Sequence, residues 1–310
     1  MTTLLYTHAM SRRHIMPPGH PERVARIEAV EAALAAPGFA PLLRREAPHG
    51  AEAEVLRCHP ARYLDWLRAR LPEEGIAPLD PDTHVCPDSL TAALHGVGAA
   101  CAAVDAVLAG EAGNAFCAMR PPGHHAEAET PMGFCLFGTV AIAAKRALDH
   151  HGLARVAVVD FDVHHGNGTQ ALLWDEGRAR FVSSHQMPLW PGSGAPSERG
   201  AHDQIRNLAL DPGAGGAAFR RAWEPALGWL DAFAPELVLV SAGFDAHAAD
   251  PLANLMLTTE DFAWITGRLC DLADAHAGGR LVSVLEGGYD LDALAASTAA
   301  HVTVLMERGA

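Results

Sequence analysis

The amino-acid sequence predicts an α/β fold with an open, mostly parallel sheet flanked by helices, and two observations support this prediction. Short apolar runs, which are typical of strands buried on both faces of a sheet, recur along the chain. Longer amphipathic or alanine-rich segments, which are typical of helices, separate these runs. Strands that alternate with helices indicate a mostly parallel sheet.

The runs expected to form strands are residues 3–6, 115–118, 156–161, 180–183, 237–241 and 281–285. The segments expected to form helices include residues 21–36, 89–109, 139–150, 217–233 and 260–277. The last helix has a start signal, because Thr258 and Thr259 can cap it and Glu260 and Asp261 favour its first turn. The proline- and glycine-rich stretch 188–196 is short and lies between strand-like segments, so it is expected to be a loop.

The domain organisation follows from length and composition. The chain has 310 residues, 49% of them hydrophobic, which is enough for one large core or two small ones. It shows no internal repeat, low-complexity tract or linker. We therefore expect a single domain over residues 1–310.

Charge and cysteine usage limit the partners and the compartment. The formal net charge of −14 repels nucleic-acid phosphates and anionic membranes; it would attract cationic substrates, although acidic soluble proteins are common. The cysteines form no C-x-x-C pair, and the amino terminus lacks the basic start and long apolar core of a signal peptide. No run approaches the roughly 20 apolar residues that span a bilayer. We expect a cytoplasmic protein with reduced thiols and no nucleic-acid or membrane partner.

Polar loops directly follow several of the expected strands. Their sequences are R-P-P-G-H-H-A from Arg120, D-F-D-V-H-H-G-N-G from Asp160, S-S-H-Q from Ser183, S-A-G-F-D-A-H from Ser241 and E-G-G-Y-D from Glu286. Open parallel sheets bind ligands beyond the carboxyl ends of their strands. We therefore expect these loops to converge on one rim.

One of these loops carries candidate metal ligands. Asp160, Asp162 and His164 alternate, and alternate residues share one face of a strand, so their side chains are expected to point the same way. A catalytic zinc takes three protein ligands and keeps an open position for water, and Asp245 at another strand end is a plausible third ligand beside Asp162 and His164. An isolated D-x-H pattern is more often a capping loop. Histidines and a tyrosine at equivalent strand ends favour the metal site here.

The two histidines and the tyrosine could transfer protons and stabilise charge beside a metal ion. His124 and His125 can serve as general base and general acid, and Asp160 and Asn167 are candidates for the partners that tune them. A carboxylate partner raises the pKa of a histidine, whereas a neutral amide has much less effect. Tyr289 follows two glycines and can donate a hydrogen bond to the oxyanion of a tetrahedral intermediate; the alternative is a core tyrosine.

Four of these motifs in order, together with G-H-P-E-R at residues 19–23, resemble the class II histone deacetylases, and most closely their bacterial relatives, the histone deacetylase-like amidohydrolases. The resemblance spans nearly the whole chain and implies the arginase/deacetylase fold. The residues that match the family's site are the zinc ligands Asp162, His164 and Asp245, the tandem histidines His124 and His125, the catalytic tyrosine Tyr289, and Asp160 and Asn167 behind the histidines.

The resemblance also implies a substrate tunnel and a monovalent-cation site. Phe134, in Gly133-Phe134-Cys135, matches one tunnel wall, and Trp190 matches the opposite wall, where many relatives have phenylalanine or tyrosine. Leu252 stands where the polyamine-specific vertebrate relative has a gatekeeper glutamate. The ligands of K⁺ or Na⁺ match Asp160, Asp162, His164, Ser183 and Ser184, partly through backbone carbonyls.

The implied reaction is metal-assisted hydrolysis of an N-acetyl amide, in which His125 moves the proton while Tyr289 and zinc hold the oxyanion. The two oxygen donors among the metal ligands make Fe²⁺ an alternative to Zn²⁺. The expected substrate is acetyl-lysine in proteins or peptides, and acetylpolyamines or other small acylated amines are the alternative. Alternatives of a different class are a non-catalytic acetyl-lysine binding protein and a scaffold for chromatin-like complexes. No extra domain or basic tail supports the scaffold. The sequence is compatible with a monomer or an oligomer.

Overall fold

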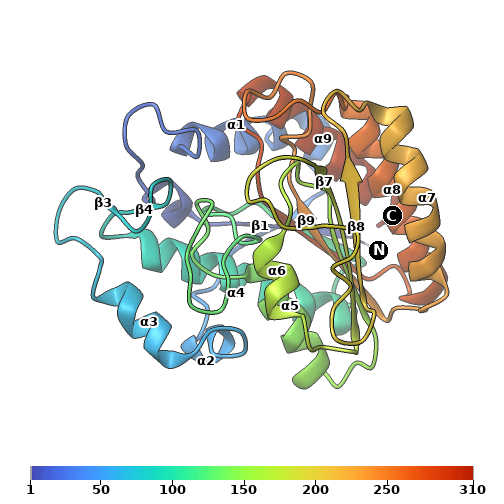
Figure 1. Ribbon diagram of the computed structural model, residues 1–310, viewed down its shortest axis with the longest axis horizontal. Helices are drawn as coiled ribbons and strands as arrows, with labels where there is room; N and C mark the ends of the chain where they lie inside the picture. Colours follow the sequence, from blue (N-terminus) through green and yellow to red (C-terminus); the bar gives the residue numbers. More distant parts are fainter. Residues whose placement is uncertain (1, 310) are drawn as a thin grey trace.

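The computed structural model describes residues 2–309 and contains an eight-stranded sheet with the order β2-β1-β5-β10-β9-β6-β7-β8 (Figure 1). Its strands are β1 (Thr3–Thr7), β2 (Leu43–Glu46), β5 (Asn114–Cys117), β6 (Val156–Asp160), β7 (Ala179–Gln186), β8 (Ile205–Leu210), β9 (Leu237–Ala242) and β10 (Leu281–Leu285). Every neighbouring pair in this sheet is parallel, which confirms the predicted fold class. A separate antiparallel pair joins β3 (Ala77–Pro78) to β4 (His84–Val85).

Helices cover both faces of the sheet (Figure 1). One face packs against α4 (Ser89–Leu108) and α5 (Thr139–Asp149), and the other against α1 (Val24–Leu34), α7 (Gly216–Asp231), α8 (Thr259–His276) and α9 (Leu291–Arg308). Along β6, Val156 and Val158 belong to the first core, whereas Ala157 and Val159 belong to the second. This alternation explains why continuous apolar runs predicted the strands: both faces of each central strand are buried.

The sequence did not predict several elements. The two edge strands, β2 and β8, are the missed strands of the sheet. The missed helices are α9 and the short α2 (Glu52–Val55), α3 (Ala61–Arg68) and α6 (Asn167–Leu172); the 3-10 turns η1 (Ala9–Arg12) and η2 (Pro37–Phe39) were also not predicted. α9 carried one usable signal, because the Asp290 carboxylate caps it by accepting a hydrogen bond from the Ala293 amide at 2.9 Å.

The start of α8 and the loop between β7 and β8 agree with the predictions. Thr258 is the N-cap residue of α8, and it forms a capping box with Asp261. The strand β7 ends at Gln186 and β8 begins at Ile205, so the stretch 188–196 lies in the connecting loop.

The end of β6 differs from the prediction and matters for the site. The strand stops at Asp160, so Asp162 and His164 lie in the following loop, and the expectation that all three residues share a strand face is wrong. The chain turns because backbone amides bond to these carboxylates. The Asp162 amide donates to Asp160 Oδ1 at 3.1 Å, and the His164 amide donates to Asp162 Oδ1 at 2.9 Å.

The apolar helix α4 corrects the expectation that no segment of the chain is apolar and long enough to span a bilayer. Within the described residues it is long and apolar enough to cross a membrane, although 78% of its most apolar window is buried inside the fold.

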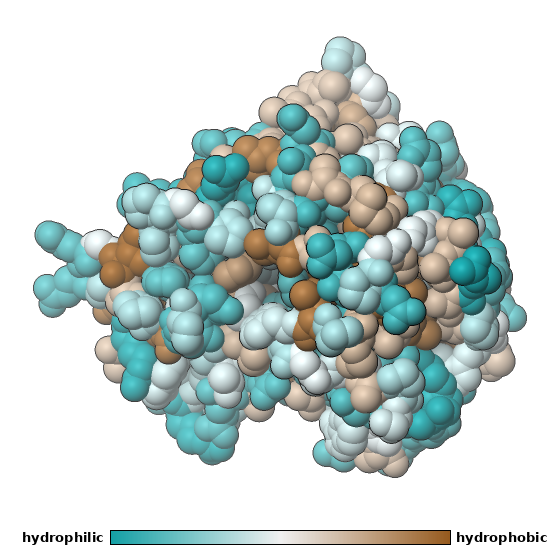
Figure 2. Space-filling model, turned by 45° about the horizontal axis from the view of Figure 1, so that its top comes forward, coloured by the Kyte–Doolittle hydropathy of each residue, from teal (hydrophilic) through white to brown (hydrophobic). Residues whose placement is uncertain are grey.

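All the cysteines are buried and free. On the face drawn in Figure 2, apolar residues form small groups among hydrophilic ones.

Candidate active site

The predicted metal ligands meet at the carboxyl ends of two adjacent strands. Asp162 and His164 follow β6, Asp245 follows β9, and these strands pair with Asp160 opposite Ser241. His164 Nδ1 lies 3.2 Å from Asp162 Oδ1 and 3.1 Å from Asp245 Oδ2. One ligand atom from each residue falls within 4.8 Å of the other two. The three side chains could therefore hold one metal ion.

The electrostatics of this cluster suit a divalent cation. Burial, together with the Asp162 carboxylate, raises the pKa of Asp245 to about 7. Although burial lowers the pKa of His164, the carboxylates of Asp162 and Asp245 raise it to about 10. Two carboxylates this close and out of water need a compensating positive charge. A donor set of two oxygens and one nitrogen fits a catalytic zinc or iron ion.

The backbone of the β10 loop closes over the cluster. The Gly287 amide donates to Asp162 Oδ2 at 2.9 Å. A Cβ at position 287 would collide with the carboxylates of both Asp162 and Asp245. Glycine is therefore needed at this position for the close approach, which is the role of the first glycine in the E-G-G-Y sequence.

The tandem histidines lie beside the cluster with the predicted residues behind them. His124 Nδ1 is 2.9 Å from Asp160 Oδ2, and His125 Nδ1 is 2.8 Å from Asn167 Oδ1. The two rings are 3.9 Å apart. Burial lowers the pKa of His124, but the carboxylates of Asp162 and Asp160 outweigh it and raise the pKa well above its usual value. Burial and the neighbouring His124 and His164 lower the pKa of His125.

Glu286 holds the backbone of the first histidine, a role that the sequence did not reveal. Its Oε2 accepts hydrogen bonds from the Gly123 amide at 2.6 Å and the His124 amide at 3.2 Å. Its Oε1 accepts from Ser241 Oγ at 3.1 Å. This buried carboxylate at the end of β10 therefore ties the loop that follows β5 to the end of strand β9.

Tyr289 lines the same site from the β10 loop. Its amide donates to Asp250 Oδ2 at 2.7 Å, and its ring lies 5.8 Å from the ring of Phe134. Burial raises the pKa of its hydroxyl well above the usual value, and Asp245 and Asp162 add to this shift, so the group remains a hydrogen-bond donor.

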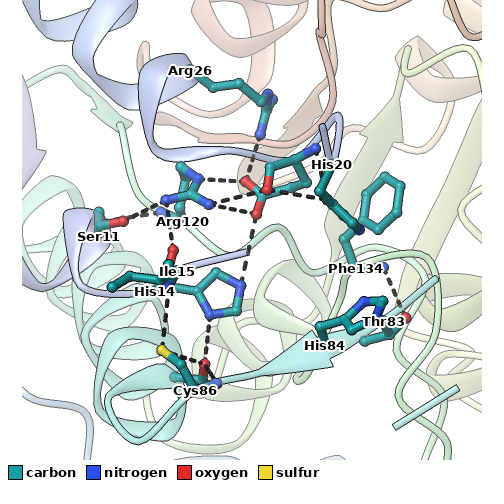
Figure 3. A network of polar contacts seen from close by, with 12 residues as sticks. Ser11, His14, Ile15, His20, Arg26, Thr83, His84, Cys86, Arg120 and Phe134 are labelled. Atoms are coloured by element: carbon teal, nitrogen blue, oxygen red, sulfur yellow. Dashed lines mark hydrogen bonds and ion pairs between the residues drawn. The ribbon is translucent and has the colours of Figure 1, made fainter. Parts of the chain in front are cut away.

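A buried ionic network contacts the loop that carries Tyr289, and Figure 3 draws its arginines Arg26 and Arg120. Glu22 is fully buried and pairs with Arg120, at 2.5 Å, and with Arg26, at 3.0 Å. Arg26 also donates to the carbonyls of Glu286 and Gly288 and lies 4.8 Å above the Tyr289 ring. Buried charges persist only when they are paired. The i,i+4 spacing of Glu22 and Arg26 was the sequence signal available for this network. The carbonyls that Arg26 binds lie 260 and 262 residues away, and the sequence did not reveal them.

A cavity of about 190 Å³ connects His125, His164 and Tyr289 to the surface. Its lining consists of Asp82, His125, Gly133, Phe134, His164, Leu189, Trp190, Leu252 and Tyr289. The predicted tunnel residues Gly133, Phe134, Trp190 and Leu252 all belong to it, whereas Asp82 and Leu189 were missed. A larger depression of about 310 Å³ between α7 and α8 contains none of the predicted site residues, so the smaller cavity is the candidate site.

The residues predicted for a monovalent cation also lie together. Asp160 at the end of β6 pairs with Ser183 inside β7, Ser184 is the next residue of that strand, and Asp162 and His164 follow Asp160 in the loop. Ser183 Oγ is 3.1 Å from His185 Nδ1. Ser184 Oγ is buried and has no hydrogen-bond partner among residues 2–309. The Ser184 hydroxyl is therefore available for a further polar contact.

Comparisons with known proteins agree with this geometry. The histone deacetylase domain family matches residues 20–305. The chain is 41% identical to the histone deacetylase-like amidohydrolase of Pseudomonas aeruginosa, covering 89% of this chain and 74% of that protein. It is 35% identical to a probable deacetylase of Archaeoglobus fulgidus, covering 94% and 82% of the two chains.

The same family appears among solved structures. The crystal structure of the HDA15 HD domain superposes with a TM-score of 0.93 at 31% identity and covers 99% of this chain and 90% of that one. The fold is therefore the arginase/deacetylase fold, as the motifs predicted. On these matches, the chain belongs to the histone deacetylase family of hydrolases.

Proposed function

We propose that this protein is a zinc-dependent amidohydrolase that removes the acetyl group from acetyl-lysine side chains in proteins or peptides. One observation carries the proposal: His125, His164 and Tyr289 line a single narrow cavity, at whose base Asp162, His164 and Asp245 converge. The aromatic walls Phe134 and Trp190 suit a long, apolar side chain. The name of the Pseudomonas relative, an amidohydrolase, supports the same reaction class.

The residues divide into binding, proton-transfer and stabilising groups. Asp162, His164 and Asp245 would hold zinc, or Fe²⁺ in its place, which polarises an acyl carbonyl and lowers the pKa of bound water. His125 takes the water proton and returns it to the leaving amine. Tyr289 donates a hydrogen bond to the developing oxyanion. Asp160, Ser183 and Ser184, with Asp162 and His164, would bind K⁺ or Na⁺.

The wider biological setting belongs to the same proposal. We propose a single-domain cytoplasmic enzyme that does not bind nucleic acid or membranes. The net charge of −14 and the buried, free cysteines support this setting.

Replacing Tyr289 with phenylalanine is expected to lower turnover by about a hundred- to a thousandfold, the usual cost of one oxyanion donor. Phenylalanine keeps the ring contacts with Phe134 and Arg26, so the loss reports on the hydroxyl. Turnover is measured on an acetyl-lysine peptide, and metal content is measured in parallel and is expected to stay intact. Wild-type turnover in this variant would refute the role.

Substrate preference tests the proposal as a whole. Leu252 cannot pair with the internal ammonium of a polyamine, whereas a carboxylate at that position can. We expect kcat/KM for acetyl-lysine peptides to exceed that for acetylspermidine, measured on a panel that also holds short-chain acyl amides. A preference of about tenfold or more for acetylspermidine would overturn the lysine proposal.

Two observations favour the second candidate, an acetylpolyamine deacetylase. Asp82 places a carboxylate in the cavity lining, and the acidic surface draws cations. The polyamine-specific vertebrate relative also resembles this chain in having tryptophan at the position of Trp190. A non-catalytic acetyl-lysine binding protein would hydrolyse no substrate on the panel, so any turnover would exclude that alternative.

A further inference from the structure

We infer that Glu127 is a positioning residue that acts on His125 through Asn167, by fixing which end of the Asn167 amide faces the histidine. The inference rests on the proposed function of His125 as the proton-transfer group. It begins from a contact that no motif suggested: Asn167 Nδ2 donates to Glu127 Oε1 at 2.9 Å.

The surroundings of Asn167 determine its orientation. An asparagine amide has a donor end and an acceptor end of nearly equal size, and its hydrogen-bond partners decide between the two orientations. Around Nδ2 lie the Glu127 carboxylate, the His125 carbonyl at 3.4 Å and the Met132 sulfur at 3.4 Å. All three are acceptors, and the carboxylate is the strongest of them. The NH₂ end must therefore point toward Glu127.

The orientation of Asn167 decides the tautomer of His125. With its NH₂ group turned to Glu127, Asn167 presents Oδ1 to His125 Nδ1 at 2.8 Å. That oxygen can only accept, so in neutral His125 the proton sits on Nδ1 and the lone pair sits on Nε2 of the ring that lines the cavity. A flipped amide would force the proton onto Nε2, and the ring could then take no proton from water.

Glu127 is placed for this task by its own turn. Its amide donates to the Thr130 carbonyl at 3.0 Å, which closes a tight turn just after the tandem histidines. Glu127 is half-buried, whereas Glu129 in the same turn is exposed and pairs with Arg62. Glu129 is therefore a matched control: a nearby carboxylate with no contact to Asn167.

The test is a double-mutant cycle on the metal-loaded enzyme. Glu127→Ala is expected to lower kcat about tenfold or more while KM stays within about twofold, because a hydrogen bond to a charged acceptor is lost. Glu127→Gln is expected to recover much of kcat, since its carbonyl still accepts from Asn167 Nδ2. In the Asn167→Ala background, Glu127→Ala is expected to change kcat less than about twofold, because no amide is left for Glu127 to orient. Glu129→Ala is expected to match the wild type.

A second measurement does not depend on turnover. Long-range proton–nitrogen spectra of ¹⁵N-histidine-labelled protein, with His125→Gln to assign the signals, report which ring nitrogen is protonated. We expect the Nδ1–H tautomer in the wild type and a growing Nε2–H population in Glu127→Ala. If the wild type hydrolysed no acyl amide, the proposed function would fail, and these spectra would still decide the present inference. Equal losses in both backgrounds, or an unchanged tautomer in Glu127→Ala, would overturn it.

Discussion

Replacing Asp162 with alanine is expected to abolish hydrolysis together with metal binding. The Asp162 carboxylate supplies one of three candidate ligands, and its Oδ1 lies 3.2 Å from His164 Nδ1. Without it, His164 and Asp245 remain as a two-ligand set, short of the three protein ligands that catalytic zinc sites use. Metal content by elemental analysis and kcat on an acetyl-lysine peptide are the measurements. Chelation of the wild type should give the same loss, and added zinc should restore activity in the wild type alone.

Two further variants separate metal loss from misfolding. Asp162→Asn keeps the shape of the side chain but removes its charge and one of its two acceptor oxygens, so it should also lose metal, and its thermal unfolding curve shows whether it is folded. Asp175→Ala removes an exposed carboxylate just before β7, at the opposite end of the sheet, and should leave both metal and rate unchanged. Should Asp162→Ala keep its metal and a near-normal rate, the ligand assignment would be wrong.

The centre of the fold could be predicted because its strands are buried on both faces. β9, with the sequence Leu-Val-Leu-Val-Ser-Ala, is buried at every position, so hydrophobicity alone marks it. The edge strand β2 has the sequence Leu-Arg-Arg-Glu, is mostly exposed and pairs with β1 alone. No apolar run marks such a strand, and only its parallel pairing with β1 reveals it.

The site residues at the strand ends could be predicted for a related reason. The carboxyl ends of parallel strands meet at one edge of a sheet, so polar residues after each apolar run must lie near one another. Glu22 and Asp82 follow no apolar run, and Glu127 comes just after the R-P-P-G-H-H-A motif, which does not include it. Their partners, including Arg120 for Glu22 and the Gly133 amide for Asp82, are distant in sequence, and local patterns do not encode such pairings.

The two histidines are expected to respond unequally to removal. His125→Ala should lower kcat by about a hundred- to ten-thousandfold, the range for a positioned general acid–base group. His124→Ala should cost clearly less, because His124 is held by the Asp160 carboxylate at 2.9 Å and its raised pKa keeps it protonated, so it acts by its charge. kcat and KM for both variants on one acetyl-lysine peptide provide the comparison.

The pair serves as its own control, since both rings are buried and only 3.9 Å apart, and each substitution removes the same imidazole ring. A general loss of packing would therefore lower both rates alike. The difference between them arises from the backing group: neutral Asn167 lets His125 gain and lose a proton in each turnover, whereas Asp160 stabilises the charged form of His124 throughout. Equal and mild losses in the two variants would mean that neither histidine moves the proton, and the division of labour proposed for them would have to be abandoned.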